Sequence, residues 1–169
     1  MFFGGNLSFD NWVSVAGDPV FLSAFLTTIM VTVIATVLTV FAGTLAAYAI
    51  ARSPKFVGRK SFSSWLIVIR AVPGVVLAVP LYQIVVGAGL YDNPIALAIC
   101  YAAINLPFSV WLMVGFIQGI PVQIEESARI DGASQFKIFT KVLLPLLKSG
   151  LGATTIFVAM LCWNEFLMP

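Results

Sequence analysis

Long apolar runs alternate with short polar stretches along the sequence. The first run is uncharged over residues 19–51, and others lie at about 64–86, about 94–117 and from about Leu146 onward. A bilayer core about 30 Å thick is crossed by roughly 20 apolar residues in a helix. Unpaired backbone groups are costly in lipid, and the runs lack the strict alternation of barrel strands. We therefore predict an all-α, polytopic membrane helix bundle with four transmembrane helices, the first long enough to tilt or project.

The composition agrees with a membrane protein. Apolar residues make up 60% and charged residues 9% of the chain, against about 45–50% and about 25% in soluble domains. The chain has no histidine, which excludes histidine-based metal sites and proton relays. Cys100 and Cys162 lie in apolar runs and are interpreted as small buried side chains. We expect contact with membrane lipid, no bound metal and no nucleic-acid partner.

The basic residues indicate the orientation of the bundle. Of the nine Lys and Arg residues, all except Arg70 lie in residues 51–61 or within and directly after residues 119–147. Because connections rich in Lys and Arg remain cytoplasmic, both segments are predicted to face the cytoplasm and the N-terminal tail to lie outside. The tail has no signal peptide, and the sequence stops within the fourth helix. We therefore interpret residues 1–169 as a single transmembrane domain, incomplete at both ends.

The connection 119–147 is the only long polar stretch, and its pattern is helical. Pro121 suits a helix start, acidic residues follow in the first turns, and Gly132 can end the helix in a left-handed conformation. A second helical stretch is predicted from about Ser134, with Phe136, Phe139 and Leu143 at helical spacing, and Pro145 marks the bend into the fourth helix. Such a helix–turn–helix can fill a groove on a soluble partner or lie in the lipid interface. The pattern alone leaves both possibilities open.

The same connection resembles the signature loop of binding-protein-dependent ABC importer permeases. The family pattern, the EAA motif, is Glu-Ala-Ala, three residues, Gly, nine residues, then Ile-x-Leu-Pro. Here Glu126-Ser127-Ala128 is followed after three residues by Gly132 and, after nine more, by Val142-Leu143-Leu144-Pro145. Ser127 and Val142 depart conservatively from the pattern. The resemblance extends over most of the chain from about Ala24 and implies a fragment of a six-helix permease in a bacterial or archaeal inner membrane.

The resemblance implies a coupling helix that docks on a cytoplasmic ABC ATPase dimer. ATP and Mg would bind to that partner, since this chain has no phosphate-binding Gly-Lys-Ser/Thr loop; we expect no cofactor and no enzymatic activity in the chain itself. The residues assigned to ATPase docking and coupling are Glu125, Glu126, Ser127, Ala128, Arg129, Asp131, Gly132, Ala133 and Pro145.

Within that family, the flanking sequence is similar to the sugar-type permeases. The similarity rests on Leu106-Pro107-Phe108 followed by Trp111-Leu112, and on Trp163-Asn164-Glu165-Phe166. It implies import of a sugar delivered by an extracytoplasmic solute-binding protein, with a second, different permease subunit completing the pathway. An ABC permease for another solute, such as a polyamine, and an ion-coupled secondary transporter are the alternatives, together with a membrane protein that does not transport.

Polar residues inside the apolar runs are candidates for the solute pathway. They are Asn105, Trp163, Asn164 and Glu165. Alternatively, the two asparagines join helices and Trp163 is an interfacial residue. A second group is assigned to helix packing or gating: Arg70, Pro73, Gly115 and Gly119. Arg70 either extends to the inner surface or pairs within the bundle, and the Gly-x-x-x-Gly spacing permits close helix contact.

Overall fold

The computed structural model describes residues 10–53, 65–66, 68–69, 72 and 74–165 of the 169-residue chain. Arg70, Pro73 and most of the basic segment 51–61 lie outside the described residues. The regular elements of the described part are helices, which agrees with the predicted all-α class. In chain order they are α1 (Asp10–Ala16), α2 (Pro19–Arg52), α4 (Gly74–Gly87), α5 (Pro94–Gln118), α6 (Val122–Ile130), α7 (Gln135–Lys137), η1 (Ile138–Leu143), α8 (Leu144–Leu146) and α9 (Lys148–Trp163).

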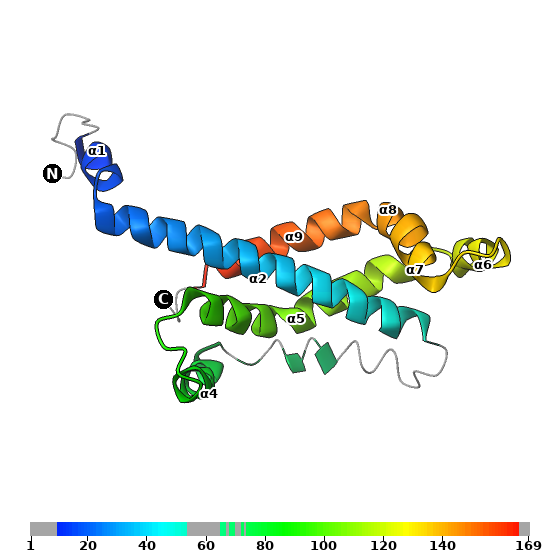
Figure 1. Ribbon diagram of the computed structural model, residues 1–169, viewed down its shortest axis with the longest axis horizontal. Helices are drawn as coiled ribbons and strands as arrows, with labels where there is room; N and C mark the ends of the chain where they lie inside the picture. The colour runs from blue at the N-terminus through cyan, green and yellow to red at the C-terminus, as the bar shows by residue number, and fades with distance from the viewer. Residues whose placement is uncertain (1–9, 54–64, 67, 70–71, 73, 166–169) are drawn as a thin grey trace, which may run out of the picture.

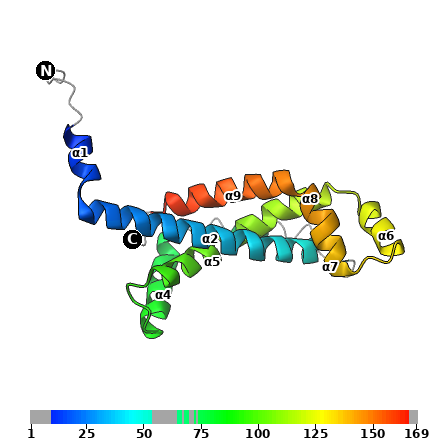
Figure 2. The ribbon, with the colours of Figure 1, turned by 45° about the horizontal axis from the view of Figure 1, so that its top comes forward.

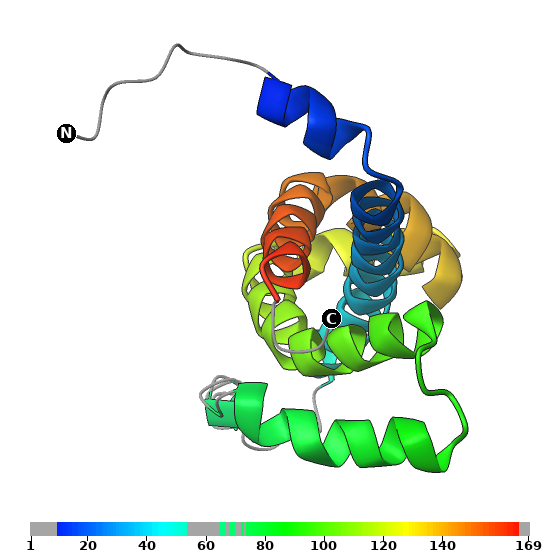
Figure 3. The same ribbon diagram turned by 90° about the vertical axis from the view of Figure 1, so that its left-hand side faces the viewer.

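Three long helices form the body of the molecule. Helices α2, α5 and α9 run along its long axis and pack on one another, whereas α4 lies crosswise and is seen almost end-on (Figure 1). Viewed along the long axis, α4 lies to one side of the group formed by the other three (Figure 3). The two ends of α2 therefore lie at opposite ends of the molecule, and α6 lies beyond the C-terminal end.

The membrane-spanning helices match the sequence prediction in part. Helices α2 and α5 are long and apolar enough to cross a bilayer, and the bent pair Gln135–Leu146 and Lys148–Trp163 would make a third span. Within the described residues, the predicted span at about 64–86 contains helical residues at 65–66 and 68–69 and the 14 residues of α4. Because about 20 residues are needed to cross a bilayer, α4 alone is too short, and the fourth span stays a prediction.

The side of α2 that packs in the bundle is distinguished by residue size. Its buried positions recur mostly every three to four residues and are nearly all small: Val31, Thr32, Ala35, Thr36, Thr39, Gly43, Thr44, Ala47 and Ala51. The larger side chains Val37, Leu38 and Phe41 are exposed between them. Small residues let helix backbones approach closely where lipid provides no hydrophobic force between helices. This arrangement turns the bulky apolar residues of α2 outward.

Two glycines make the closest helix contacts. A Cβ atom on Gly43 of α2 would lie 2.3 Å from Ser109 Oγ of α5, and one on Gly150 of α9 would lie 2.6 Å from Phe116 Cγ. By contrast, a Cβ atom on Gly115 would meet nothing within 4 Å, and one on Gly119 would approach only the backbone of its own helix end. Among the described residues, Gly115 and Gly119 therefore meet no other helix, since the surface of α5 that packs on α9 lies at Phe116, and their assignment to helix packing stays a prediction.

The chain bends between the two parts of the last apolar segment. Residues 135–146 and 148–163 meet at 74°, and the break falls at Leu147, two residues after the predicted bend at Pro145. Proline has no N–H group to donate to the carbonyl four residues before it. The preceding turn, Ile138–Leu143, is a π-helix, a wider turn that occurs where the regular pattern of hydrogen bonds is disturbed. Pro145 thus disturbs the helix. The helix axis then turns at Leu147, between α8 and α9.

Candidate functional site

The predicted helix–turn–helix forms a projecting end of the molecule. Figure 2 shows α6 beyond the C-terminal end of α2 and α7 beside that end, both far from α1. Helix α6 ends as the sequence predicted, because Gly132 adopts a left-handed conformation with φ 83°. The amide of Ala133 donates to the carbonyl of Ala128 at 3.0 Å, a pattern that satisfies the last carbonyl groups of a helix. The next helix begins at Gln135, with Ser134 as its N-cap.

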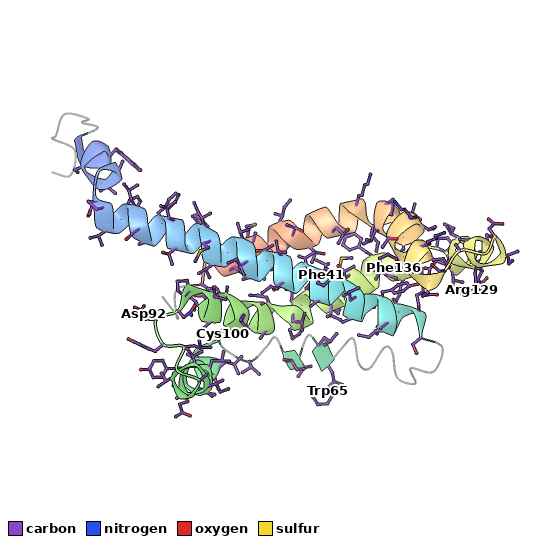
Figure 4. The ribbon with its side chains drawn as sticks, viewed as in Figure 1. Phe41, Trp65, Asp92, Cys100, Arg129 and Phe136 are labelled. Carbon is purple, nitrogen blue, oxygen red and sulfur yellow. The ribbon has the colours of Figure 1, made fainter. Side chains whose placement is uncertain are left out.

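Most predicted docking residues lie on the exposed surface of this end. Glu126, Ser127, Arg129 and Asp131 are exposed, whereas Ala128 and Ala133 are half-buried and Pro145 lies farther along at the bend. Two large apolar side chains accompany the charges: Ile130 is 86% exposed and Phe136 is 76% exposed. Figure 4 shows Arg129 and Phe136 at this end. We call Glu126, Arg129, Ile130, Asp131 and Phe136 the α6–α7 face.

The apolar stripe predicted from Phe136, Phe139 and Leu143 is divided in the structure. Leu143 is fully buried in the core, and the ring of Phe139 packs against Tyr48 of α2 with 5.1 Å between ring centroids. Phe136 points away and takes no part in this packing. Helical spacing alone could not separate a core residue from a surface residue, since the turn widens into a π-helix between Phe136 and Leu143.

Glu125 differs from its neighbours because its carboxylate is turned toward α2. The side chain is 3% exposed, and Arg52 Nε donates to Glu125 Oε1 at 2.6 Å. The hydroxyl of Tyr48 donates to Glu125 Oε2 at 3.0 Å. Arg52 Nη2 also donates to the carbonyl of Ile120 at 2.9 Å. Both carboxylate oxygens are therefore occupied within the chain, and we call Tyr48, Arg52 and Glu125 the α2–α6 clamp.

Further hydrogen bonds link the clamp to the exposed face. Gln135 Nε2 donates to the hydroxyl oxygen of Tyr48, and Arg129 Nη2 donates to Gln135 Oε1 at 3.2 Å. The sequence predictions assigned Glu125 to the surface and did not include Tyr48 or Arg52. The only sequence feature that relates these two residues is their spacing: Tyr48 lies four residues before Arg52, so both lie on the same side of the last turns of α2. Nothing in the sequence relates these residues to Glu125, which lies 73 positions beyond Arg52.

The predicted solute-pathway residues lie in α5 and at the end of α9. Asn105 is buried in α5, where Nδ2 donates to the Tyr101 carbonyl at 2.9 Å and lies 3.6 Å from Cys162 Sγ of α9. This placement agrees with the helix-joining alternative. Trp163 is half-exposed and contacts Phe25 edge-on, while exposed Asn164 donates to the carbonyl of Met160 in its own helix. Glu165 is half-buried and is the last described residue.

A cavity of about 510 Å³ lies at the end of the bundle opposite α6. It is lined by α2, α4, α5 and the turn between α4 and α5. Its polar lining comes from Thr27, Tyr82, Tyr91, Asp92 and Asn93. Figure 4 labels Asp92 and Cys100 on this side. None of the predicted solute-pathway residues lines it. Within the described residues, no three His, Cys, Asp or Glu side chains are grouped as metal ligands.

Comparisons of the sequence and of the structure with known proteins agree on one family. Residues 40–169 match the family described as "Binding-protein-dependent transport system inner membrane component". The chain is 34% identical over 143 residues to the putative ABC transporter permease protein ORF1 of Streptomyces antibioticus, covering 85% of this chain and 62% of that protein. It is 33% identical over 162 residues to the trehalose transport system permease protein SugB of Mycobacterium tuberculosis, covering 96% of this chain and 59% of that protein.

A solved structure is similar along nearly the whole chain. It is the crystal structure of a bacterial ABC transporter involved in the import of the acidic polysaccharide alginate. The TM-score is 0.77 with 28% sequence identity, and the match covers 95% of this chain and 56% of that one. The sequence thus spans little more than half the length of the relatives it matches.

Proposed function

We propose a function from one premise: this chain belongs to the family of binding-protein-dependent transport system inner membrane components. On that premise it is part of the permease of an ABC-type importer in the inner membrane. Helices α2, α5 and α9 contribute to the membrane-spanning bundle. The α6–α7 face docks on a cytoplasmic ATPase, which binds ATP and Mg and drives transport. A second permease subunit and an extracytoplasmic solute-binding protein complete the assembly.

One observation supports the docking role most directly, namely the composition of the α6–α7 face. Ile130 and Phe136 are among the most exposed large apolar residues described, and Glu126, Arg129 and Asp131 are exposed on the same projecting end. Exposed apolar side chains with a polar rim are typical of protein interaction sites.

The transported solute is proposed to be a sugar. The relatives named above include a trehalose permease and a transporter involved in alginate import. The segment Trp163-Asn164-Glu165 at the end of α9 combines an aromatic ring with amide and carboxylate groups, which suit sugars through stacking and hydrogen bonds to hydroxyls. Under this proposal, the end of α9 lies on the outer side and α6 on the cytoplasmic side.

The docking proposal is tested by removing its apolar anchor in the full-length permease. Phe136→Ala, expressed with the ATPase subunit of the same importer, should reduce the amount of ATPase that co-purifies about tenfold, corresponding to about 1.4 kcal/mol of binding free energy. The matched control is Trp12→Ala, because Trp12 in α1 is 75% exposed at the opposite end of the molecule. This control should leave co-purification unchanged.

Equal co-purification of the ATPase with wild-type protein and Phe136→Ala would overturn the docking role of this face. A loss with Trp12→Ala as well would show that the effect reports on exposed aromatic residues in general. ATP-dependent uptake in proteoliposomes, measured with a panel of sugars and with a polyamine, then tests the solute class. Uptake driven by an ion gradient without ATP would favour a secondary transporter instead.

A further inference from the structure

The α2–α6 clamp is the main polar connection between the projecting end and the long helices. Helix α6 extends beyond the bundle, and most of its side chains are exposed. Its one buried residue is Glu125, in the first turn. The carboxylate is held by two side chains from the last two turns of α2, Tyr48 and Arg52. The start of α6 is therefore fixed to the end of α2 by charge and hydrogen bonds.

The geometry of Arg52 restricts α6 in more than one direction. Its Nε contacts the carboxylate of Glu125, and its Nη2 contacts the carbonyl of Ile120 in the segment joining α5 to α6. One guanidinium group thus joins α2 to two points of the connection. Arginine presents its donors in a planar, rigid fork, which fixes orientation as well as distance. A lysine, with a single ammonium group on a flexible stem, would retain the charge without this geometry.

The burial of the pair makes it costly to break. Arg52 and Glu125 have side-chain exposures of 16% and 3%. Removing one partner from a buried pair leaves an unpaired charge away from water, which is more damaging than the loss of an exposed pair. The first turn of α6 therefore moves together with the end of α2, unless the clamp opens and exposes both charges.

We propose that Arg52 and Glu125 are positioning residues that transmit displacement of α6 to α2. The inference rests on the proposed function, since it takes an ATPase docked on the α6–α7 face as the source of the displacement. The exposed face would hold the ATPase, and the buried clamp would carry its movement to the membrane helix. Docking and transmission are thereby assigned to different residues of one short helix: Glu126, Arg129 and Ile130 to docking, and Glu125 to transmission.

The first test measures the clamp without reference to ATP or solute. Trypsin cleaves after Arg129, an exposed residue in the last turn of α6. In full-length permease in lipid nanodiscs, Arg52→Ala and Glu125→Gln should raise the rate of cleavage after Arg129 by about tenfold, because cleavage follows the population of the open form. Lys141→Ala is the matched control, as it removes one exposed cation from the same end and should cleave at the wild-type rate.

Charge reversal provides a test that does not depend on truncating a side chain. Arg52→Glu and Glu125→Arg should each raise cleavage after Arg129, distinguished by fragment mass from the trypsin site that Glu125→Arg adds, and the double variant that exchanges the two charges should return this rate toward the wild-type value. Recovery requires that the two side chains still meet, so it would support the pair directly. Cleavage in the double variant as fast as in the two single reversals would overturn the proposed contact.

The second test separates transmission from docking in the reconstituted importer. With Arg52→Ala, ATPase co-purification should stay at the wild-type level, whereas solute imported per ATP hydrolysed should fall about tenfold; Arg52→Lys should recover part of it. A merely structural role would lower co-purification and uptake together, which would overturn the proposal. Unchanged uptake per ATP in both Arg52→Ala and Glu125→Gln would overturn it too. If instead Phe136→Ala retains the ATPase, the docking function fails while the trypsin result still decides whether the clamp holds α6.

Discussion

Two connections flank α5, and the structure stabilises them in different ways. The turn of residues 88–93, between α4 and α5, is closed by its own backbone: Leu90 N donates to the Val85 carbonyl at 3.0 Å, and Asn93 caps α5. The connection 119–147, between α5 and α9, has comparable local bonds at Gly132. It is also joined to α2 through the α2–α6 clamp.

The difference shows which connection can pass a displacement to another helix. A turn closed by local bonds follows the two helices that it joins. A connection tied to a third helix by a buried ion pair moves that helix as well. The clamp links residues 73 positions apart, whereas the bonds of the short turn span a few positions. The longer connection is therefore the one suited to pass a displacement, applied by a docked partner, to α2.

The largest expected effect comes from the two left-handed glycines, one in each connection. Gly132 has φ 83° and Gly89 has φ 71°, and a Cβ atom would meet nothing within 4 Å at either position. Valine at each site therefore introduces backbone strain of about 1–2 kcal/mol, with no clash at its Cβ atom. Gly132→Val should reduce ATP-dependent uptake by about tenfold or more, since the strain is relieved by reorienting α6 against α7. Gly89→Val should keep uptake near the wild-type level.

Uptake assays in proteoliposomes with equal amounts of each variant check this prediction. Similar losses in both variants would mean that uptake depends on the stability of either connection and that the comparison fails. Wild-type uptake with Gly132→Val would show that the angle between α6 and α7 is not required.

A second effect, on stability rather than on uptake, is expected where the long connection enters α9. A Cβ atom on Gly150 would lie 2.6 Å from Phe116 Cγ of α5, so Gly150→Ala should destabilise the protein by about 1–3 kcal/mol through overpacking. Gly152 in the same helix has open space around it. Gly152→Ala should instead stabilise the protein by about 0.5–1 kcal/mol, because alanine loses less backbone entropy in a helix. Thermal unfolding of the full-length protein in detergent measures both, and equal midpoints would contradict the close contact of α5 with α9.

The smallest effect is expected from the two N-caps. Asn93 Oδ1 accepts from the amide of Ile95 at 2.9 Å, whereas Ser134 Oγ accepts from the amide of Lys137 at the longer distance of 3.4 Å. Asn93→Ala should cost about 1 kcal/mol, and Ser134→Ala should cost less, because its bond is longer and α7 has only three residues. Hydrogen exchange at the Ile95 and Lys137 amides compares them directly. A larger loss of protection at Lys137 would show that the long connection depends on local caps after all.

Local features of this fold could be predicted from the sequence. The apolar run 94–117 became α5 within one residue, and Gly132 ended α6 in the predicted left-handed conformation. These features depend on neighbours within a few positions, such as an apolar run of bilayer length or a glycine after a helical turn. Glu126, Arg129 and Asp131, which the resemblance assigned to docking, are exposed on or beside α6.

Features that depend on distant residues could not be predicted in the same way. The burial of Glu125 requires Arg52 and Tyr48, and neither residue is marked as its partner by the sequence. The assignment of Gly115 and Gly119 to close packing stays a prediction: neither meets another helix within the described residues, and glycine spacing does not show which side of α5 meets α9. Gly43 and Gly150 make those contacts instead, and each needs a matching residue on another helix.

The length of α2 has a mechanical consequence. Its 34 residues measure about 51 Å at about 1.5 Å per residue. Its closest contact with α5 is at Thr39 and Gly43, where the Ser109 hydroxyl donates to the Thr39 carbonyl. A rigid rod pivoting there has a short arm of about 14–20 Å toward Arg52 and a long arm of about 30–36 Å toward Pro19. Such a lever would roughly double, at the far end, any small sideways movement applied at the clamp.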